Sequence, residues 1–476
     1  GTEIGSYNSY TYKGNVIGQV TDNLQIGLDY LHGNSDNYRE GSEYDKDNYG
    51  ISLNYKIDNN QKINFKYTKY TNDYSSPAVL TQAQLDKDRD GASTSETDYQ
   101  ADKDSYSLVY DYNMKDNLKF NLLSSYYNSV SESSTSTSIT NFDESKIAFK
   151  PKLNYEYSKG TLTAGYDYTF NNIVRDTKLG NGAFYDISKM TNSVFLNNRY
   201  DMNKLELITG YRYEKSDYEM KDQKYGTKTP SDMDKTSSNS AYSMGLNYLY
   251  SDSGKLYGKF ESGYTFPDPR QYINLTNGEG ELNNLQDEEF MTYEIGFQDY
   301  IINSLVKGAV YYTEKENEIR KEGSSSDVKF YNIDASKRIG GELSISQNIK
   351  KLELSESIAY VDAKVTEGTY EGKRIPYVSK ITSSINATYT FNEKVDLSGN
   401  ITYRDKYYVD ASNLSGLVND KFVTDIKVNY SIDSNWKTYA GINNLFNADY
   451  YNTINYRSGA YTYDPASERN YFIGFN

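Results

Sequence analysis

The sequence predicts an all-β protein, in which residues 1–476 form a single domain: a transmembrane antiparallel up-and-down β-barrel. Three observations lead to this prediction. Apolar and polar residues alternate along most of the chain, tight turns alternate with long polar connections, and 53 tyrosines recur from end to end.

The alternation has the period of a β-strand. Residues 49–57 place Tyr, Ile, Leu, Tyr and Ile at every second position, with Gly, Ser, Asn and Lys between them, and residues 162–170 and 422–432 repeat this pattern. Successive side chains of a strand point to opposite faces, so one face is apolar and the other is wet. That is what a lipid-facing wall around an aqueous or plugged lumen requires. A soluble sheet is the alternative, but it needs a second apolar layer, which a content of 37% hydrophobic residues does not easily supply.

The connections differ in length on the two sides of the predicted barrel. Short ones, rich in Asp, Asn, Ser and Gly, are expected near 21–23, 58–61, 114–117, 159–160, 201–203, 252–254, 301–303, 349–351, 392–393 and 433–435. Long ones are expected near 35–47, 73–103, 131–142, 176–188, 220–238, 267–288, 321–326, 366–376, 408–419 and 448–466. We interpret these as periplasmic turns and extracellular loops. The pattern gives about 22 strands, the number of plugged outer-membrane transporters, whereas open porins have about 16–18.

Composition excludes several classes of function. The chain has no cysteine, so it has no disulfide and no thiolate metal site, and its single histidine, His32, offers little for acid–base or zinc chemistry. A net charge of -15 argues against nucleic acid as a partner. No apolar run is long enough for a transmembrane helix. No nucleophile elbow is recognisable, so we expect no enzyme. The chain has no signal peptide and opens inside a strand-like segment at Gly1, as expected of a mature fragment.

Five segments, in order, resemble the barrel of TonB-dependent outer-membrane receptors. Each is a weak signal alone, but their order and spacing fit the family across the chain. They are the aromatic-x-x-Pro segment 266–269, the Asn-Leu-x-x-Glu segment 284–288, the Tyr-Glu-x-Gly strand 293–297, the Arg-x-Pro segment 374–377 and the Asn-Leu-Phe segment 444–447 with Tyr450. Pro465 and residues 469–471 resemble the lead into the last strand of that family.

The resemblance implies a receptor in the bacterial cell outer membrane that imports a scarce chelated solute. Its expected partners are the lipid bilayer, lipopolysaccharide, a small chelated ligand and the TonB complex. TonB would act through an N-terminal plug and a TonB box, and we expect that neither is in this chain. Barrels of the family commonly end on an aromatic residue, whereas here Phe475 is penultimate, which puts the end of the last strand in doubt.

Two local resemblances point to different ligands. Residues 1–4 and 27–30 with His32 resemble the opening strands of cobalamin receptors, whereas Pro77, residues 80–84 and Asp88 with Arg89 resemble a loop of ferric-complex receptors. We favour a ferric-siderophore-type iron complex, since the first resemblance is mostly barrel framework. Cobalamin, haem and a passive porin-like channel remain the alternatives.

Two groups of loop residues are candidates for contact with the ligand. Arg270, Tyr272 and Asn274 lie in the 267–288 connection, where an arginine beside aromatics can bind a carboxylate or catecholate. Tyr407, Tyr408, Tyr461 and Tyr463 are further candidates in later loops. The alternative for both groups is loop scaffolding.

Two metal hypotheses also arise. Asp86, Asp88 and Asp90, followed by Gly91, match the opening of a calcium loop, although position 12 would be Thr97 in place of Glu. We expect no required cofactor, and a solvated acidic loop is the alternative to calcium. His32 could ligate haem iron, but an ordinary polar strand residue is the alternative because the chain has no second histidine.

Overall fold

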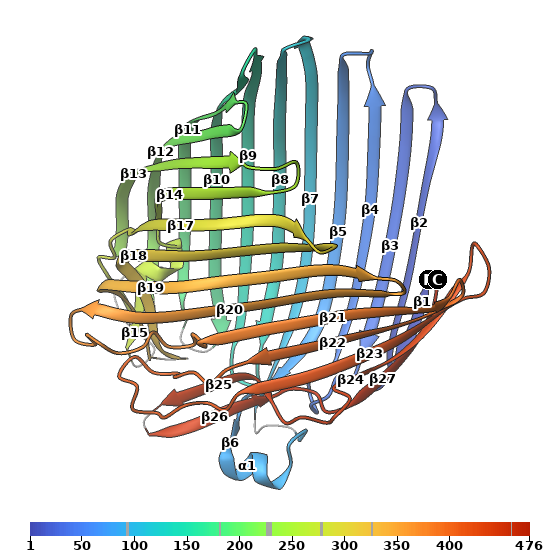
Figure 1. The fold of residues 1–476 in the computed structure, drawn as a ribbon. Coiled ribbons are helices and arrows are strands. Elements are labelled where there is room, and N and C mark those ends of the chain that lie inside the picture. Colours follow the sequence, from blue (N-terminus) through green and yellow to red (C-terminus); the bar gives the residue numbers. More distant parts are fainter. Residues whose placement is uncertain (92–94, 180–181, 225–230, 277–278, 325–326, 458) are drawn as a thin grey trace.

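The protein is a closed β-barrel. The computed structural model describes residues 1–91, 95–179, 182–224, 231–276, 279–324, 327–457 and 459–476. Within these residues the main sheet has 24 strands, of which β15 (Ile273–Thr276) and β16 (Glu279–Leu282) form a hairpin inside a connection. The others form the wall, an antiparallel barrel of 22 strands, as the sequence predicts (Figure 1).

Each strand of the wall pairs with its neighbours along the chain, which is the predicted up-and-down order. Between the two ends of the wall the strands run in sequence: β3 (Leu24–Ser35), β4 (Tyr44–Lys56), β5 (Gln61–Pro77), β7 (Glu96–Lys115), β8 (Leu118–Ser134), β9 (Ile139–Tyr157), β10 (Gly160–Leu179), β11 (Phe184–Met202), β12 (Leu205–Lys224), β13 (Ser231–Leu249), β14 (Lys255–Thr265), β17 (Glu288–Ile301), β18 (Ser304–Ser324), β19 (Asp327–Ile349), β20 (Leu352–Glu367), β21 (Ile381–Asn392), β22 (Val395–Arg404), β23 (Lys421–Ser431) and β24 (Lys437–Asn443).

The ends of the chain close the barrel. β1 (Thr2–Gly5) lies between β2 (Ser9–Thr21) and β27 (Asn470–Phe475), with Glu3 opposite both Thr11 and Gly474. The Tyr439 hydroxyl on β24 donates a hydrogen bond of 2.8 Å to Glu3 across this seam. Closure leaves few backbone N–H and C=O groups without a partner in the wall.

The outer face of the wall carries the predicted apolar belt. Ile51 lies opposite Leu28 on β3 and Tyr67 on β5, and the same face continues through Leu108 and Tyr126. These positions alternate with polar residues that point into the barrel. Many of the outward apolar side chains are exposed, because no described part of the chain covers this face.

The short connections are tight hairpin turns, as predicted. Asn203, Asn303 and Lys350 have positive φ angles of 57°, 63° and 55° in the turns after β11, β17 and β19. Positive φ is the requirement of the turn types whose twist matches that of two antiparallel strands.

Several expected long loops were predicted wrongly, because the ladder of hydrogen bonds runs through them. β10 and β11 extend to Leu179 and from Phe184, so most of the expected 176–188 connection is strand. The expected 131–142 connection is reduced to residues 135–138 in the same way. The period-two signal of an apolar belt weakens in these extensions while the backbone pairing continues, and in β11 the side chains of Tyr185 and Ile187 pack into an apolar cluster with the loop between β14 and β17.

Two short helices lie in the connections. α1 (Gln82–Lys87) follows the short strand β6 (Leu80–Thr81), and the 3-10 helix η1 (Pro269–Tyr272) precedes β15. No helix among the described residues is long and apolar enough to cross a membrane.

Aromatic rings cover glycines on neighbouring strands of the wall. Tyr257 lies over Gly296, Tyr311 over Gly340 and Tyr439 over Gly474, and each pair is directly opposed in register. A ring over a cross-strand glycine shields backbone that the glycine leaves open and helps to fix the register.

We expect Gly340→Ala to destabilise the barrel by about 1–3 kcal/mol, which is typical of overpacking. A Cβ at this position would lie 2.3 Å from the Tyr311 ring and 2.7 Å from the carbonyl oxygen of Tyr360. The measurement is the unfolding temperature in detergent. Gly258→Ala is the matched control, because nothing lies within 4 Å of its Cβ position. Equal unfolding temperatures for the two variants would contradict the argument.

Candidate functional site at the loop-side mouth and inner wall

The connection between β14 and β17 folds onto the ends of β11 to β13. Tyr272 is fully buried there, with its ring edge-on to Tyr218 at 5.4 Å between centroids. The Tyr218 hydroxyl donates to the carbonyl oxygen of Pro267 at 3.0 Å, and the Lys235 ammonium donates to the carbonyl oxygen of Leu285. This loop is therefore fixed to the wall by an apolar cluster of its own.

The first group of predicted ligand contacts is split by this packing. The Tyr272 side chain is buried in the apolar cluster and anchors the loop, so it does not reach the mouth of the barrel. Burying its ring among apolar neighbours is more favourable than leaving it exposed at the mouth. Asn274 holds loop backbone, accepting from the Phe330 amide at 2.7 Å. Arg270 has an exposed side chain, bonded only within the loop to Asp268 at 3.0 Å in the contacts described. Of the three, Arg270 alone is free to meet a ligand.

Three of the four later tyrosines that the sequence offered as candidates lie in one cluster. Tyr407, Tyr461 and Tyr463 belong to a cluster formed by the connections 405–420 and 444–469, the second of which contains β25 (Tyr451–Arg457) and β26 (Ala460–Pro465). Tyr407 is buried, whereas Tyr461 and Tyr463 are partly exposed. Tyr408 lies apart from this cluster, with the Arg374 guanidinium 5.6 Å from its ring centroid.

Asp410 fixes the fold of the 405–420 connection. Burial opposes its ionisation, but hydrogen bonds from the Ser412 and Ser415 side chains and from the Leu414 and Ser415 amides outweigh burial and lower the pKa of Asp410 to about 2. The carboxylate is therefore charged near neutral pH, where it keeps accepting the hydrogen bonds that stabilise this turn.

Arg39 joins three connections that are far apart in the sequence. Its guanidinium is nearly buried and donates to the carbonyl oxygens of Ala78 and Gly91 at 2.9 Å and 3.5 Å, and it lies 3.4 Å from the Asp464 carboxylate. Pairing of β6 with β26 links the same two longer connections, with Thr81 opposite Thr462. In Figure 1, β6, α1, β25 and β26 gather at the loop side of the barrel.

Arg89 makes a second bridge between these connections. Its guanidinium donates to the Tyr450 carbonyl oxygen at 2.7 Å and lies 5.1 Å from the centroid of the Tyr451 ring. The two arginines are thus structural links. The sequence did not identify them, because Asp464 and Tyr450, their partners in the 444–469 connection, lie 425 and 361 residues away.

A cavity of about 620 Å³ lies beside Arg39 at the mouth. It is lined by tyrosines, by cations and by residues of the 444–469 connection. The lining includes Tyr38, Tyr44, Lys46, Tyr70, Tyr74 and, from that connection, Thr453. Aromatic rings next to an ammonium and a guanidinium suit a ligand that is both planar and anionic.

The predicted calcium residues do not form one group of ligands. Asp86 lies in α1 and accepts from the Gln82 amide at 2.7 Å. A side-chain hydrogen bond with Asp88 raises the pKa of Asp90, so these two carboxyl groups interact with each other. In the described part of the chain, the one group of three His, Asp or Glu residues with ligand atoms within 4.8 Å is His32, Asp45 and Asp47.

His32 points away from the lumen. It lies on β3 opposite Tyr12 and Asp47, on the same face as Leu28 and Tyr30, which belong to the outer apolar belt. A haem inside the barrel is therefore out of its reach, which weakens the haem alternative.

The inner face of β4 to β9 is rich in lysine. Alternation from the outward residues Ile51, Tyr67 and Leu108 sets which side chains point inward. Inward lysines outnumber inward carboxylates; they are Lys46, Lys56, Lys62, Lys66, Lys103, Lys119, Lys146, Lys150 and Lys152, against Asp111, Glu144 and Glu156. Some are paired, as Lys62 is with Asp111 at 3.4 Å and Lys119 with Glu156 at 2.7 Å.

The outer face of the same strands has the opposite charge toward the loop side. Its carboxylates are Asp45, Asp47, Asp73, Glu96, Asp98, Asp102, Asp104, Glu132 and Asp143, and Lys69 is the lysine among them. The net negative charge of the chain is thus not spread evenly, because this part of the wall separates cations inside from anions outside.

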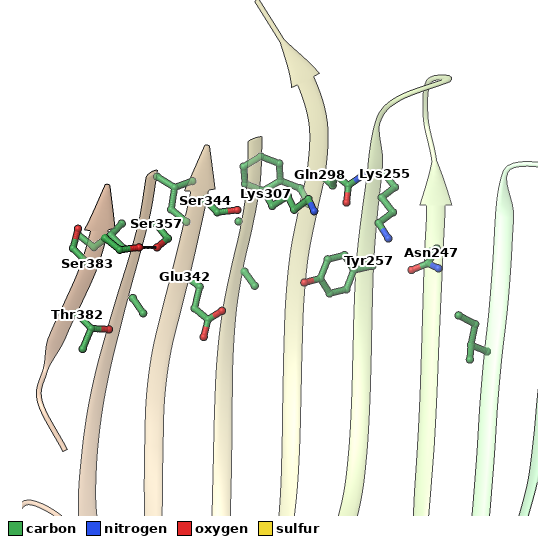
Figure 2. Close-up of a pocket in the computed structure, with 18 residues that line it drawn as sticks. Asn247, Lys255, Tyr257, Gln298, Lys307, Glu342, Ser344, Ser357, Thr382 and Ser383 are labelled. Carbon is green, nitrogen blue, oxygen red and sulfur yellow. Dashed lines mark hydrogen bonds between the residues drawn. The ribbon is translucent and has the colours of Figure 1, made fainter. Parts of the chain in front are cut away.

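The inner wall also has polar hollows. One of about 760 Å³ lies over β13, β14 and β17 to β21 (Figure 2), where Lys255, Lys307, Gln298 and Tyr257 share one face of the wall. Another, of about 740 Å³, is lined by Lys150, Lys152 and Arg212, with Arg212 paired to Asp167 at 2.8 Å and Glu214 at 2.9 Å. Both are broad and open, which suits contact with another folded segment more than capture of one small molecule.

Comparison with known proteins identifies the family. The sequence model described as "TonB dependent receptor-like, beta-barrel" matches residues 2–445. The chain belongs to this family. Its members are receptors and transporters, in keeping with the expected class of function.

Individual relatives of this TonB-dependent receptor barrel are distant. The catecholate siderophore receptor Fiu of Escherichia coli is 22% identical over 246 residues, which cover 49% of this chain and 32% of that receptor. The aligned part thus spans about a third of the length of the curated relative that it matches.

Solved structures share the fold. The closed form of Fiu from Escherichia coli has a TM-score of 0.82 at 14% identity, covering 100% of this chain and 80% of that chain. The ferric yersiniabactin uptake receptor FyuA from Yersinia pestis has 0.86 at 13%, covering 100% and 78%. The copper transporter OprC has 0.83 at 15%, covering 100% and 79%, so the barrel alone does not decide the cargo.

The family motifs of this receptor barrel act as loop anchors. Asn444 is buried and its amide group donates to the Ala448 carbonyl oxygen at 2.9 Å, while Leu285 is buried against β12 and β13 in the cluster around Tyr272. The Glu288 carboxylate accepts from the Ile319 amide at 2.7 Å. The motifs therefore identify the framework of the mouth and not the ligand. The basic inner face could have been found from the sequence by asking which lysines fall on the inward positions of each predicted strand.

We expect Arg39→Gln to leave the barrel folded and to speed proteolysis within residues 78–95 and 444–469 by about tenfold or more. The change removes charge-assisted bonds worth about 1.5–3 kcal/mol that hold the connections together, and local opening controls cleavage. Limited proteolysis with mass-spectrometric mapping is the measurement. Arg270→Gln is the control, because its side chain is exposed and bonded within its own loop. Unchanged cleavage in Arg39→Gln would show that the connections are held by apolar packing alone.

Proposed function

We propose that this chain is the barrel of an outer-membrane importer for an anionic ferric complex of the siderophore type. The observation that carries the proposal is the basic inner face of β4 to β9 in a chain whose net charge is -15. A stretch of inner wall on which positive charge predominates raises the local concentration of anionic ligands and speeds their entry.

The mouth supports the same cargo class. The cavity beside Arg39 combines Lys46 with Tyr44, Tyr70 and Tyr74, so it offers both charge and stacking surfaces. Arg270 is exposed and Tyr461 and Tyr463 are partly exposed at the same end of the barrel. Catecholate and carboxylate groups on iron carry negative charge on planar groups, which these side chains would bind by charge-assisted hydrogen bonds and stacking. Cobalamin matches these positive side chains less well than an anionic ferric complex does, so it remains the second choice.

Transport in this proposal needs parts beyond the barrel. A plug domain would occupy the lumen against the broad polar hollows of the inner wall, and TonB would pull on that plug from the periplasm. The outer apolar belt with its tyrosines would contact the bilayer, and lipopolysaccharide would surround the acidic rim. A bound calcium ion at Asp86, Asp88 and Asp90 would require these side chains to rearrange from their present contacts.

Binding by the full-length protein in detergent tests the proposal. Ferric catecholate, ferric citrate, cyanocobalamin and haemin are titrated separately, each with and without calcium. We expect an anionic ferric complex to bind and cyanocobalamin not to bind. Tight binding of cyanocobalamin alone would overturn the proposal, and free passage of unrelated solutes in a liposome-swelling assay would favour the passive channel.

Charge in the lumen is tested by the combined change Lys66→Gln, Lys146→Gln and Lys150→Gln. Among the described ion pairs none involves these side chains, so their removal leaves no carboxylate unpaired. We expect the association rate of the ferric complex to fall by about tenfold or more at low ionic strength and the difference to shrink as salt is added. Lys69→Gln on the outer face is the matched control and should change little. If the association rate falls equally in the triple variant and in Lys69→Gln, the lumen lysines do not attract the ferric complex.

A further inference from the structure

The single histidine of the chain lies in a group of metal-binding side chains on the outer wall. His32 on β3 faces Asp47 on β4 directly, and Asp45 follows on the same face toward the loop side. Tyr30 and Tyr49, the next outward pair, belong to the apolar belt. The group therefore lies just beyond the belt, outside the lumen and apart from the regions proposed to meet the cargo.

The distances within the group fit a small divalent ion. The His32 Nδ1 atom lies 3.1 Å from Asp47 Oδ1 and 3.9 Å from Asp45 Oδ1, and all three ligand atoms lie within 4.8 Å of one another. Bonds of about 2.0–2.1 Å to a tetrahedral zinc ion place neighbouring ligand atoms about 3.3 Å apart. The two measured separations lie on either side of this value, so small side-chain rotations suffice to close the group around an ion.

The charges around the group call for a cation. Asp45 lies directly opposite Asp73 on β5, and like charges in such a cross-strand pair are destabilising. Lys69, the outward lysine on these strands, is bound 2.7 Å from Asp102 and 3.8 Å from Asp104. The carboxylates of Asp45, Asp47 and Asp73 thus face one another without a lysine or arginine in the described ion pairs, and a divalent ion would offset their repulsion.

Neighbouring groups hold the three side chains in place. The Tyr30 hydroxyl donates to Asp47 Oδ1 at 2.9 Å, and the Asn34 amide donates to Asp45 Oδ2 at 3.2 Å. The Tyr10 and Tyr12 rings lie 5.5 Å and 6.4 Å from the imidazole ring, between their centroids. Hydrogen bonds to the carboxylate ligands and packing on the imidazole are what orient ligands in metal sites.

We propose that His32, Asp45 and Asp47 bind a divalent transition-metal ion of the zinc type on the outer wall of the barrel. The imidazole nitrogen favours zinc and its neighbours over calcium and magnesium, which prefer oxygen ligands alone. Three protein ligands leave one position open on the outward side for water or a phosphate oxygen. The site goes beyond the proposed import function and does not depend on the cargo.

The test uses the full-length protein in a detergent without phosphate, with the imidazole nitrogens labelled selectively. His32 is the only histidine of residues 1–476, and its signals are assigned as those that disappear in His32→Asn. We expect zinc chloride to bind with a stoichiometry of one in calorimetry and to shift these signals, and calcium chloride in excess to leave them unchanged. Asp45→Asn and Asp47→Asn should each weaken binding by about tenfold or more, and His32→Asn should abolish it.

Asp102→Asn and Asp104→Asn are the matched controls, because each removes one carboxylate from the same face at the Lys69 pair. They should leave zinc affinity unchanged, and heat-modifiable gel migration verifies that every variant is folded. Zinc binding that persists in His32→Asn would overturn the proposal. An equal loss of zinc affinity in the two controls would also overturn it. The same holds for His32 signals that do not shift with zinc, and for displacement of zinc by calcium.

Discussion

Closure of the sheet is the constraint on which the rest of the structure depends. A strand buried in lipid has no water to satisfy its backbone, so its N–H and C=O groups must find partners in neighbouring strands. The chain meets this requirement by pairing every strand with the next and by joining β1 to β27. Once the wall is closed, alternate side chains point to opposite sides of the sheet. This separation lets a strongly acidic protein have a lysine-rich inner face along β4 to β9.

The mouth of the barrel is organised by a different principle. Its connections have small apolar clusters of their own, around Tyr272 and around Tyr407. Arg39, which is buried, and Arg89, which is partly buried, bond the connections to one another. Arg39 reaches partners in two connections, one of them more than 400 residues away in the sequence. A rigid mouth of this kind presents a fixed set of exposed groups to a ligand, with little ordering entropy left to lose on binding.

The sequence predicts the wall well and the mouth poorly, for a physical reason. Residues 49–57 reveal a strand because one face must be apolar along its whole length, and Asn203 reveals a turn because its backbone needs positive φ. Tyr272 looked like a ligand contact because nothing local shows that Tyr218 and Leu285 bury it. The polar extension of β10 was missed because outside the apolar belt neither face has to be apolar, and the lysines were seen as polar residues without being assigned together to one face.

The seam between β1 and β27 has a consequence for how this molecule is made. Thr2 to Gly5 pair with Phe472 to Phe475, so the contact that completes the ring joins the first and last strands of the barrel. Until the last strand has been synthesised and delivered, the growing sheet presents two long open edges that invite pairing with any other extended chain. The ring therefore cannot close before β27 is in place, and the edges of the sheet stay open to pairing with other chains until then.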